Sequence, residues 1–280
     1  MTHKERVERE EPPEVQEWDT GTHPDFYRHY EQYSVSPASL ARFEGIRDAI
    51  LFALACTGAR MDSLDVLDIG CNAGTQARFW TDKGHRYVGV DINAPLVELA
   101  RQRAAETGLE ARFEVGSATE LPYPEGSFDV CIMPELLEHV AAWRDCLDEA
   151  VRVLRPGGVL YLSTSNWLCP YQQEFNLPLY SWYPPFLKRY YERRAMTDRP
   201  ELANYAKYPA VNWFSVYRLR AYLEPLGFSC LDRFDLVDTA NKGTAARLVL
   251  GLLRGLPPLR LLGHMLTPYT VLVARKSPRG

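Results

Sequence analysis

The sequence has few features of a disulfide-bonded, membrane-spanning or nucleic-acid-binding protein. Its six cysteines are scattered and form no C-x-x-C pair, so we expect neither a disulfide framework nor a thiolate zinc site. The formal net charge of −4 argues against a general nucleic-acid-binding protein. The most apolar stretch, residues 248–266, is interrupted by two arginines, two prolines and a histidine, so we do not expect it to span a membrane.

The N-terminus is charged and lacks the apolar centre of a signal peptide, which together with the unpaired cysteines favours the cytoplasm. We expect residues 1–36 to be a flexible lead-in whose tyrosines, Tyr27, Tyr30 and Tyr33, close over a ligand as a lid. The chain is 46% hydrophobic and 24% charged, which is average for a globular protein. Residues 37–280 are therefore expected to form one domain with insertions.

Apolar and β-branched runs alternate with helix-length segments over the first 165 residues. This alternation predicts an α/β fold in which a mostly parallel sheet carries helices on both faces. The predicted strands are 64–69, 85–92, 111–116, 127–133 and 159–164, and the predicted helices are 37–56, 74–82, 94–107 and 143–154.

The alternation stops twice in the second half of the chain. Residues 166–212 are rich in aromatic residues and proline, and residues 239–267 are apolar without a clear period. A helix near 216–226 and strands at 228–237 and 269–275 surround the second gap. Because both gaps are short, we expect two irregular insertions that cap one domain.

The string VLDIGCNAG, residues 66–74, places a glycine turn directly after the first predicted strand. Such a turn at the carboxyl end of a parallel strand is where a nucleotide-like ligand binds, and Gly70 and Gly74 would clear room for its close approach. The second strand ends in Asp91, 21 residues after Gly70, at the spacing of an acid that binds ribose hydroxyls. The dinucleotide pattern G-x-G-x-x-G is incomplete, and Asp68 would repel a pyrophosphate. This charge favours a cationic adenosine ligand, S-adenosylmethionine, over a nicotinamide dinucleotide.

Four strings in order, VLDIGCNAG, YVGVDIN, GSATELPYPEGSFDVCIM and VLRPGGVLYLST, resemble the successive motifs of class I S-adenosylmethionine-dependent methyltransferases (methyltransferase type 11-like). The resemblance implies a Rossmann-like, seven-stranded sheet whose last strand is antiparallel. It implies contacts of Asp91 with the ribose, of Ile92 with the adenine, and of Pro134 near the sulfonium. Ser117 stands where the family often has Asp. The positions that the resemblance assigns to the cofactor are Asp68, Gly70, Cys71, Asn72, Gly74, Asp91, Ile92, Ser117, Ala118 and Pro134.

The string MPELLEHVAAW, residues 133–143, follows the fourth strand. Pro134 suits the first position of a helix, on which Glu135, Glu138 and His139 would share one face. Carboxylates and imidazole are ligands for Mg²⁺ and similar ions, so these three residues are a candidate metal site. The same E-x-x-E-H string resembles the metal-binding string of ubiquinone-biosynthesis O-methyltransferases and of small-RNA 2′-O-methyltransferases.

The string is also compatible with roles that need no metal. Acidic residues in a first helical turn stabilise the helix dipole by themselves. Without a metal, His139 is the best general base, with Glu135 beside it, although a structural histidine bonded to backbone is an equal alternative. If a metal is bound, Asn166 and His264 are candidates for a further ligand.

The two insertions bear on the acceptor. The aromatic residues of 166–212 either form a small core of their own or cover a ring-shaped or apolar acceptor. Residues 239–267 either pack on the sheet or lie on a membrane surface. We therefore expect O-methylation of a small or lipid-like hydroxyl compound, such as a prenylated phenol or a lipid-linked sugar. A sugar, RNA or protein acceptor and a non-catalytic cofactor-binding module are the alternatives.

Overall fold

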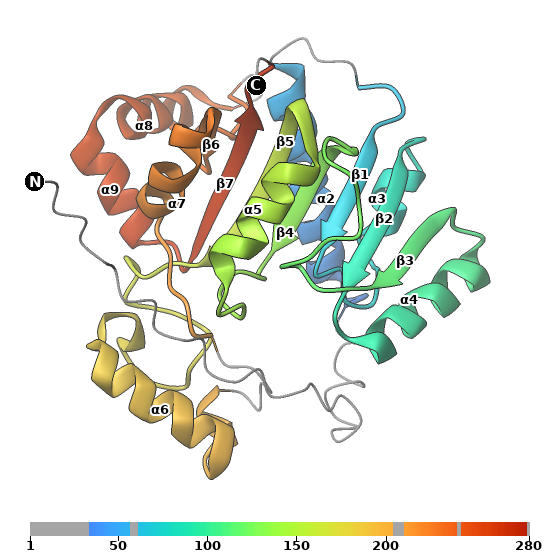
Figure 1. Ribbon diagram of the computed structural model, residues 1–280. Helices are drawn as coiled ribbons and strands as arrows, with labels where there is room; N and C mark the ends of the chain where they lie inside the picture. Colours follow the sequence, from blue (N-terminus) through green and yellow to red (C-terminus); the bar gives the residue numbers. More distant parts are fainter. Residues whose placement is uncertain (1–33, 57–60, 204–209, 240–241, 279–280) are drawn as a thin grey trace, which may run out of the picture.

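The computed structural model describes residues 34–56, 61–203, 210–239 and 242–278, which form a seven-stranded sheet with helices on both faces (Figure 1). The strand order is β3-β2-β1-β4-β5-β7-β6, and β7 runs antiparallel to both of its neighbours. This confirms the predicted Rossmann-like sheet with an antiparallel last strand. The strands are β1 Asp65–Ile69, β2 Arg86–Asp91, β3 Ala111–Val115, β4 Phe128–Pro134, β5 Leu154–Ser165, β6 Phe228–Asp232 and β7 Tyr269–Lys276.

Eight α-helices and three short 3₁₀ turns lie within the described ranges, and each of these helices is too short or too polar to cross a bilayer. The helices are α2 Pro37–Ala55, α3 Ala77–Thr81, α4 Ala94–Thr107, α5 Trp143–Val153, α6 Pro185–Thr197, α7 Val216–Leu223, α8 Thr244–Gly255 and α9 Pro257–Met265. The 3₁₀ turns are η1 Tyr180–Trp182, η2 Pro200–Ala203 and η3 Glu224–Leu226.

Neighbouring residues of the central strands enter two different cores, because side chains alternate between the faces of a strand. Val66 and Val130 pack against α2, α3 and α4, whereas Leu67 and Cys131 pack against α5 and α7. All four residues are fully buried. The continuous apolar runs of the sequence therefore reflect a sheet that is covered on both faces.

Helix α4 shows why the sequence predicts the helix bounds well in this region. The side chain of Asn93 accepts a hydrogen bond from Leu96 N at 3.2 Å, which caps the helix start. Gly108 ends the helix in the left-handed region, with φ of 64°. The bounds 94–107 expected from the sequence are confirmed.

Four expectations need correction. Residues 166–212 are not irregular throughout, because they contain α6, η1 and η2, and residues 239–267 are not irregular, because they contain α8 and α9. Strand β6 ends at Asp232 rather than at 237, because the carboxylate of Asp232 accepts Phe234 N at 2.9 Å and turns the chain. Strand β5 begins at Leu154, earlier than expected.

The first insertion leaves and re-enters the sheet at one narrow neck. Trp167 N donates to Phe214 O at 3.0 Å, and Phe214 N donates to Ser165 O at 3.1 Å. Between these ends, α6 and its flanking turns extend beyond the edge where the parallel strands end (Figure 1). We call residues 167–213 the cap; of these, 204–209 lie outside the described ranges. At the same edge, the strand order reverses between β1 and β4, which is where ligands bind in such sheets.

We predict that Gly74→Ala destabilises the fold strongly. Gly74 has φ of 69°, and a Cβ there would lie 2.6 Å from the Phe113 ring and 2.8 Å from Ala100 Cβ. We expect a loss of about 2–4 kcal/mol in the free energy of unfolding, from the left-handed backbone and from overpacking. The measurement is urea unfolding.

Gly84→Ala is the matched control, since Gly84 has φ of 82° and no atom within 4 Å of an added Cβ. It should lose only about 1–2 kcal/mol, the cost of the left-handed backbone. Equal losses in both variants would contradict the packing role of Gly74.

Candidate functional site

The turn after β1 is hydrogen-bonded to the end of β2. Gly70 N donates to Val90 O at 2.7 Å, and Asn72 N donates to Asp91 Oδ2 at 2.8 Å. Asn72 adopts φ of 48°, and its side-chain amide donates to Gly70 O at 3.1 Å. The structure therefore brings the glycine turn and the strand-end carboxylate together, as the sequence predicts.

Asp91 is held at the centre of this arrangement. Its second oxygen, Oδ1, accepts Asn93 N at 2.8 Å, and the residue is 8% exposed. Burial raises the pKa of Asp91 above its usual range, and the two backbone hydrogen bonds lower it again in part. A carboxylate has about four acceptor positions, so two backbone bonds leave capacity for further donors.

Asp68 is a buried carboxyl with one oxygen unused. The Tyr87 hydroxyl donates to Asp68 Oδ2, whereas Asp68 Oδ1 has no hydrogen-bond partner among the described residues. Burial raises the pKa of Asp68 to about 7. A buried oxygen without a donor is costly, so this position suits a ligand that brings a donor or a positive charge.

Two further polar side chains beside the turn were not predicted from the sequence. The hydroxyl of Thr75 and both ends of the Gln76 amide are buried without partners among the described residues. Gln76 is only 1% exposed. The sequence signal is their position, since both polar residues come directly after the second glycine of the turn. Buried polar side chains usually have a hydrogen-bond partner, so these two residues are candidates for ligand contacts.

The glycines of the turn serve packing in the first place. The Phe113 ring and Ala100 fill the space beside Gly74, and the Leu136 side chain lies 3.1 Å from the position of a Cβ on Gly70. Cys71 is 6% exposed, and burial raises its thiol pKa well above the usual range. These contacts give both glycines a packing role, and the cofactor contacts predicted for Gly70 and Gly74 stay predictions.

The residues predicted to contact the adenine differ in exposure and in the hydrogen bonds that they already form. Ile92 is an apolar side chain that is 49% exposed directly after β2. Ser117 Oγ lies 2.8 Å from Thr119 Oγ1 and accepts Thr119 N at 3.2 Å, so its hydroxyl bonds within its own turn. Ala118 is partly buried against the core. The cofactor contacts assigned to these three residues stay predictions.

The helix expected at residues 134–139 is wrong. Pro134 is the last residue of β4 and pairs with Ser163 of β5. Glu135 follows in the left-handed region with φ of 51°, and residues 137–139 form a turn. A helical face that would align Glu135, Glu138 and His139 is therefore absent from this segment.

The expected metal site is not formed by these residues. Glu135 lies 2.5 Å from the Arg42 guanidinium of α2, whereas Glu138 Oε2 accepts the Thr164 hydroxyl at 2.8 Å in β5. Glu138 is 0% exposed, and burial, with a smaller effect of Glu174, raises its pKa to about 8. No group of three or more His, Cys, Asp or Glu residues in the described ranges is arranged to hold a metal ion.

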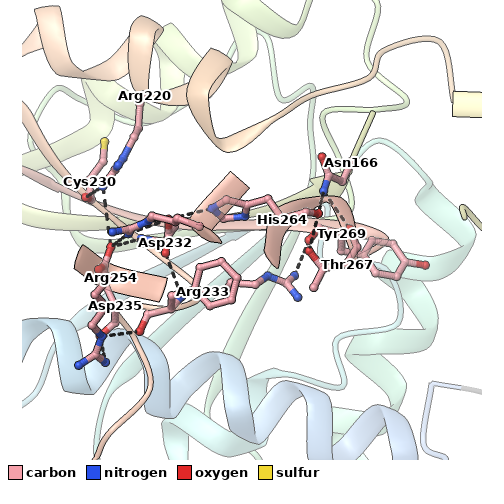
Figure 2. Close-up of polar contacts among 12 residues, drawn as sticks. Asn166, Arg220, Cys230, Asp232, Arg233, Asp235, Arg254, His264, Thr267 and Tyr269 are labelled. Atoms are coloured by element: carbon pink, nitrogen blue, oxygen red, sulfur yellow. Dashed lines mark hydrogen bonds and ion pairs between the residues drawn. The ribbon is translucent and has the colours of Figure 1, made fainter. Parts of the chain in front are cut away.

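The candidates for a further metal ligand have structural roles instead. The Asn166 amide donates to His264 O and to Thr267 O, each at 2.8 Å, and His264 Nε2 lies 3.0 Å from Asp232 Oδ2 (Figure 2). These contacts fasten α9 to the sheet. His139 N donates to Leu136 O at 3.0 Å, and its predicted role as a base stays a prediction, as does that of Glu135.

The aromatic residues of the cap are divided between a core and a cavity. Phe175, Tyr180 and Trp213 belong to a small buried cluster, in which the Phe175 and Tyr180 rings stack at 4.1 Å. Trp167 and Trp182 are 44% and 49% exposed and line a cavity of about 910 Å³. The expected small core is therefore confirmed, and the expected cover over an acceptor stays a prediction. The predicted lid tyrosines, Tyr27, Tyr30 and Tyr33, lie outside the described residues.

Comparison with known proteins identifies the domain around this site. Residues 67–162 match the family model described as a methyltransferase domain. A solved structure described as an S-adenosylmethionine-dependent methyltransferase from Mesorhizobium loti has a TM-score of 0.52 and 17% identity. It covers 81% of this chain and 98% of that one, which supports the fold.

Two named relatives are similar over the same part of the chain. One is a probable chloroplastic tocopherol O-methyltransferase of Oryza sativa subsp. japonica, 31% identical over 52% of this chain and 41% of the relative. The other is a ubiquinone biosynthesis O-methyltransferase of Xanthomonas oryzae pv. oryzae, 33% identical over 42% of this chain and 48% of the relative. The matches span less than half the length of these curated relatives.

The sheet topology and these matches agree with the resemblance of the sequence to class I S-adenosylmethionine-dependent methyltransferases. The match to a methyltransferase domain covers residues 67–162, which contain the glycine turn and both buried carboxyls.

We predict that Asp68 makes the wild-type protein lose stability between about pH 4 and pH 7. Its pKa is about 7 in the fold and 3.8 when unperturbed, so the folded state binds the proton more tightly. The resulting stabilisation is complete below about pH 4 and is lost as the pH rises through about 7.

The measurement is urea unfolding of the wild type and Asp68→Asn at several pH values. The stability of the wild type relative to Asp68→Asn should fall by up to about 4 kcal/mol over this range. Parallel pH profiles would show that Asp68 is not a buried, proton-binding carboxyl.

Proposed function

We propose that this protein transfers the methyl group of S-adenosylmethionine to a hydroxyl group of a ring-bearing or lipid-like acceptor. The observation that carries the proposal is the pair of buried carboxyls at the ends of β1 and β2. Asp91 is bonded to the glycine turn and keeps acceptor positions, and Asp68 has an unused buried oxygen. These carboxyl oxygens suit ribose hydroxyls and a positively charged ligand group.

The residues at the turn would hold the cofactor in defined positions. Asp91 would accept the ribose hydroxyls, and the exposed side chain of Ile92 would pack on the adenine. Asp68, Thr75 and Gln76 offer buried polar atoms without partners among the described residues, and they would bind the methionine part. S-adenosylmethionine supplies, when bound, a methyl group on a sulfonium.

The acceptor side would be formed by the end of β4, the end of β5 and the cap. Holding the reacting groups in line can contribute about 7–11 kcal/mol to the barrier reduction. His139, in the turn after β4, would take the proton of the acceptor hydroxyl. Arg42 would hold the Glu135 carboxylate in place beside this turn.

An oxygen acceptor is supported by the names of the two relatives. Both are O-methyltransferases, one named for tocopherol and one for ubiquinone biosynthesis. The aromatic lining of the cap cavity is of the kind that covers ring-shaped or apolar groups. A prenylated phenol combines these features, so we favour this acceptor class.

We predict that Asp91→Asn weakens the binding of S-adenosylmethionine by about 10- to 100-fold. The substitution replaces a charged acceptor by a neutral amide, and a charge-assisted hydrogen bond contributes about 1.5–3 kcal/mol. The measurement is isothermal titration calorimetry, with thermal unfolding to check the fold, because Asp91 also accepts two backbone N–H groups.

Asp129→Asn is the control, since Asp129 pairs with Arg155 and accepts Asp65 N on the opposite edge of the sheet. Its affinity for the cofactor should be unchanged. Wild-type protein that binds a nicotinamide dinucleotide and not S-adenosylmethionine would refute the proposed function. Turnover of any hydroxyl acceptor would exclude a non-catalytic binding module.

A further inference from the structure

The cap cavity is lined by aromatic rings and also by polar and positively charged side chains. Its walls include the rings of Trp167, Trp182, Tyr183 and Trp213, which enclose flat groups. Trp213 is 7% exposed, so its ring is fixed by the surrounding structure. The lining contains no Asp or Glu residue among those that the structure describes.

Two hydrogen-bond donors in this lining are unused. Ser181 is 4% exposed, and its hydroxyl has no partner among the described residues. The same holds for the indole N–H of Trp213. Buried donors of this kind are rare in native proteins without a ligand or water to accept from them.

Two cations complete the lining. The Lys188 ammonium lies 4.4 Å from the centroid of the Trp213 ring, and the Arg218 guanidinium donates to Trp213 O at 3.1 Å. Neither side chain forms a salt bridge with a carboxylate in the part of the chain that the structure describes. Burial lowers the pKa of Lys188 to about 8, and Glu192 on the next turn of α6 partly opposes this effect. Burial removes water from the Lys188 ammonium, and a bound anion would stabilise its positive charge in place of that water.

We propose that this cavity binds an aromatic ring that carries an anionic group, with the ring against the indoles and the anion on the Lys188 ammonium. Resting on the proposed function, this ligand is the methyl acceptor, so the phenol favoured above carries a carboxylate or phosphate group. The polar groups of the lining point to one chemistry, since all of them can donate a hydrogen bond and the lysine, arginine and indole groups cannot accept one.

Two segments connect the cavity with the carboxyl ends of the parallel strands: the one that follows β5 and the one that ends the cap. Trp167 follows Asn166 directly after β5. Trp213 follows Asn212, whose amide donates to Leu137 O at 3.1 Å and to Val140 O at 2.6 Å. These contacts connect the cavity wall with the turn after β4, where the resemblance places the sulfonium.

The test compares three soluble compounds by calorimetry: 3,4-dihydroxybenzoate, phenyl phosphate and catechol. The two anions should bind at least about tenfold more tightly than catechol, and the preferred anion identifies the head group. Lys188→Met should reduce this preference to about twofold or less, with unchanged affinity for S-adenosylmethionine.

The matched control is Arg189→Met, which removes a cation one residue away that does not line the cavity. Equal binding of all three compounds, or equal losses in the two variants, would overturn the proposal. Wild-type protein without affinity for S-adenosylmethionine would instead refute the proposed function, and the anion preference could still be measured.

A second, independent observation concerns the outward side of α8 and α9. Four side chains of these helices and the residue between them are large, aliphatic and exposed: Leu248 by 65%, Val249 by 54%, Leu252 by 42%, Leu256 by 46% and Leu262 by 53%. Leu266, directly after α9, is 82% exposed. We call these six residues the leucine face.

The opposite side of the two helices is fastened to β6 and the residues after it. Arg260 pairs with Asp232 and Asp235, and Arg254 donates to Val237 O at 2.7 Å and to Phe234 O at 2.9 Å. Figure 2 shows Arg254, Asp232 and Asp235 in this network beside His264. These contacts fasten α9 and the carboxyl end of α8, whereas the first turns of α8 are exposed on all sides.

Charge indicates what covers this face. Residues 239–267 hold four Lys and Arg residues and no Asp or Glu. Arg254 and Arg260 bind the support, whereas Lys242 and Arg247, at the start of α8, are exposed. An aliphatic helix surface on a segment of positive charge is typical of helices that lie in a membrane interface. Protein interfaces, in contrast, are enriched in Tyr, Trp and Arg.

We infer that the leucine face docks on an anionic lipid surface. Flotation with vesicles of phosphatidylcholine, with and without phosphatidylglycerol, tests this inference. The wild type should float with the anionic vesicles, and Leu248→Glu should lose at least about tenfold in binding, because a charge replaces an inserted leucine.

The control is Leu226→Glu in η3, at the amino end of β6, because the leucine there is 46% exposed and does not belong to the leucine face. This variant should float like the wild type, and thermal unfolding checks that both variants are folded. A dimer in sedimentation that Leu248→Glu dissociates, without vesicle binding by the wild type, would assign the face to a second copy and overturn the inference. Cofactor binding is independent of either result.

Discussion

The hydrogen bonds of Asp91 are the constraint on which the cleft depends. One carboxylate oxygen accepts the backbone N–H of Asn72 in the glycine turn, and the other accepts that of Asn93, the N-cap of α4. A single side chain thus fixes the turn after β1 relative to the helix after β2. Loss of this carboxylate would affect the shape of the site as well as the proposed contacts with ribose, so folding and binding have to be measured together.

The sequence predicted best those features that depend on neighbouring residues. Val66 and Leu67 face opposite cores, so buried strands appear as continuous apolar runs, and Asn93 and Gly108 mark the two ends of α4. The acid after β2 could be placed because parallel strands bring their carboxyl ends to one edge.

The remainder depends on contacts between distant segments. The spacing of Glu135 and Glu138 suits a helix, yet Arg42 of α2 binds one carboxylate and Thr164 of β5 binds the other. No local pattern separates Arg42 from other surface arginines. The packing of Phe113 against Gly74 is equally invisible in the sequence. The position of α9 depends on Asp232 and Asp235, at the end of β6 and just after it, which pair with Arg260.

The neck of the cap has an evolutionary consequence. The two ends of the cap meet through the hydrogen bonds of Trp167 and Phe214, so the segment between them begins and ends at nearly the same place. Lengthening a loop whose ends are already joined costs little chain entropy. Selection can therefore exchange or enlarge this segment without disturbing the sheet, so related chains can differ in the cap while the strands and the glycine turn stay the same.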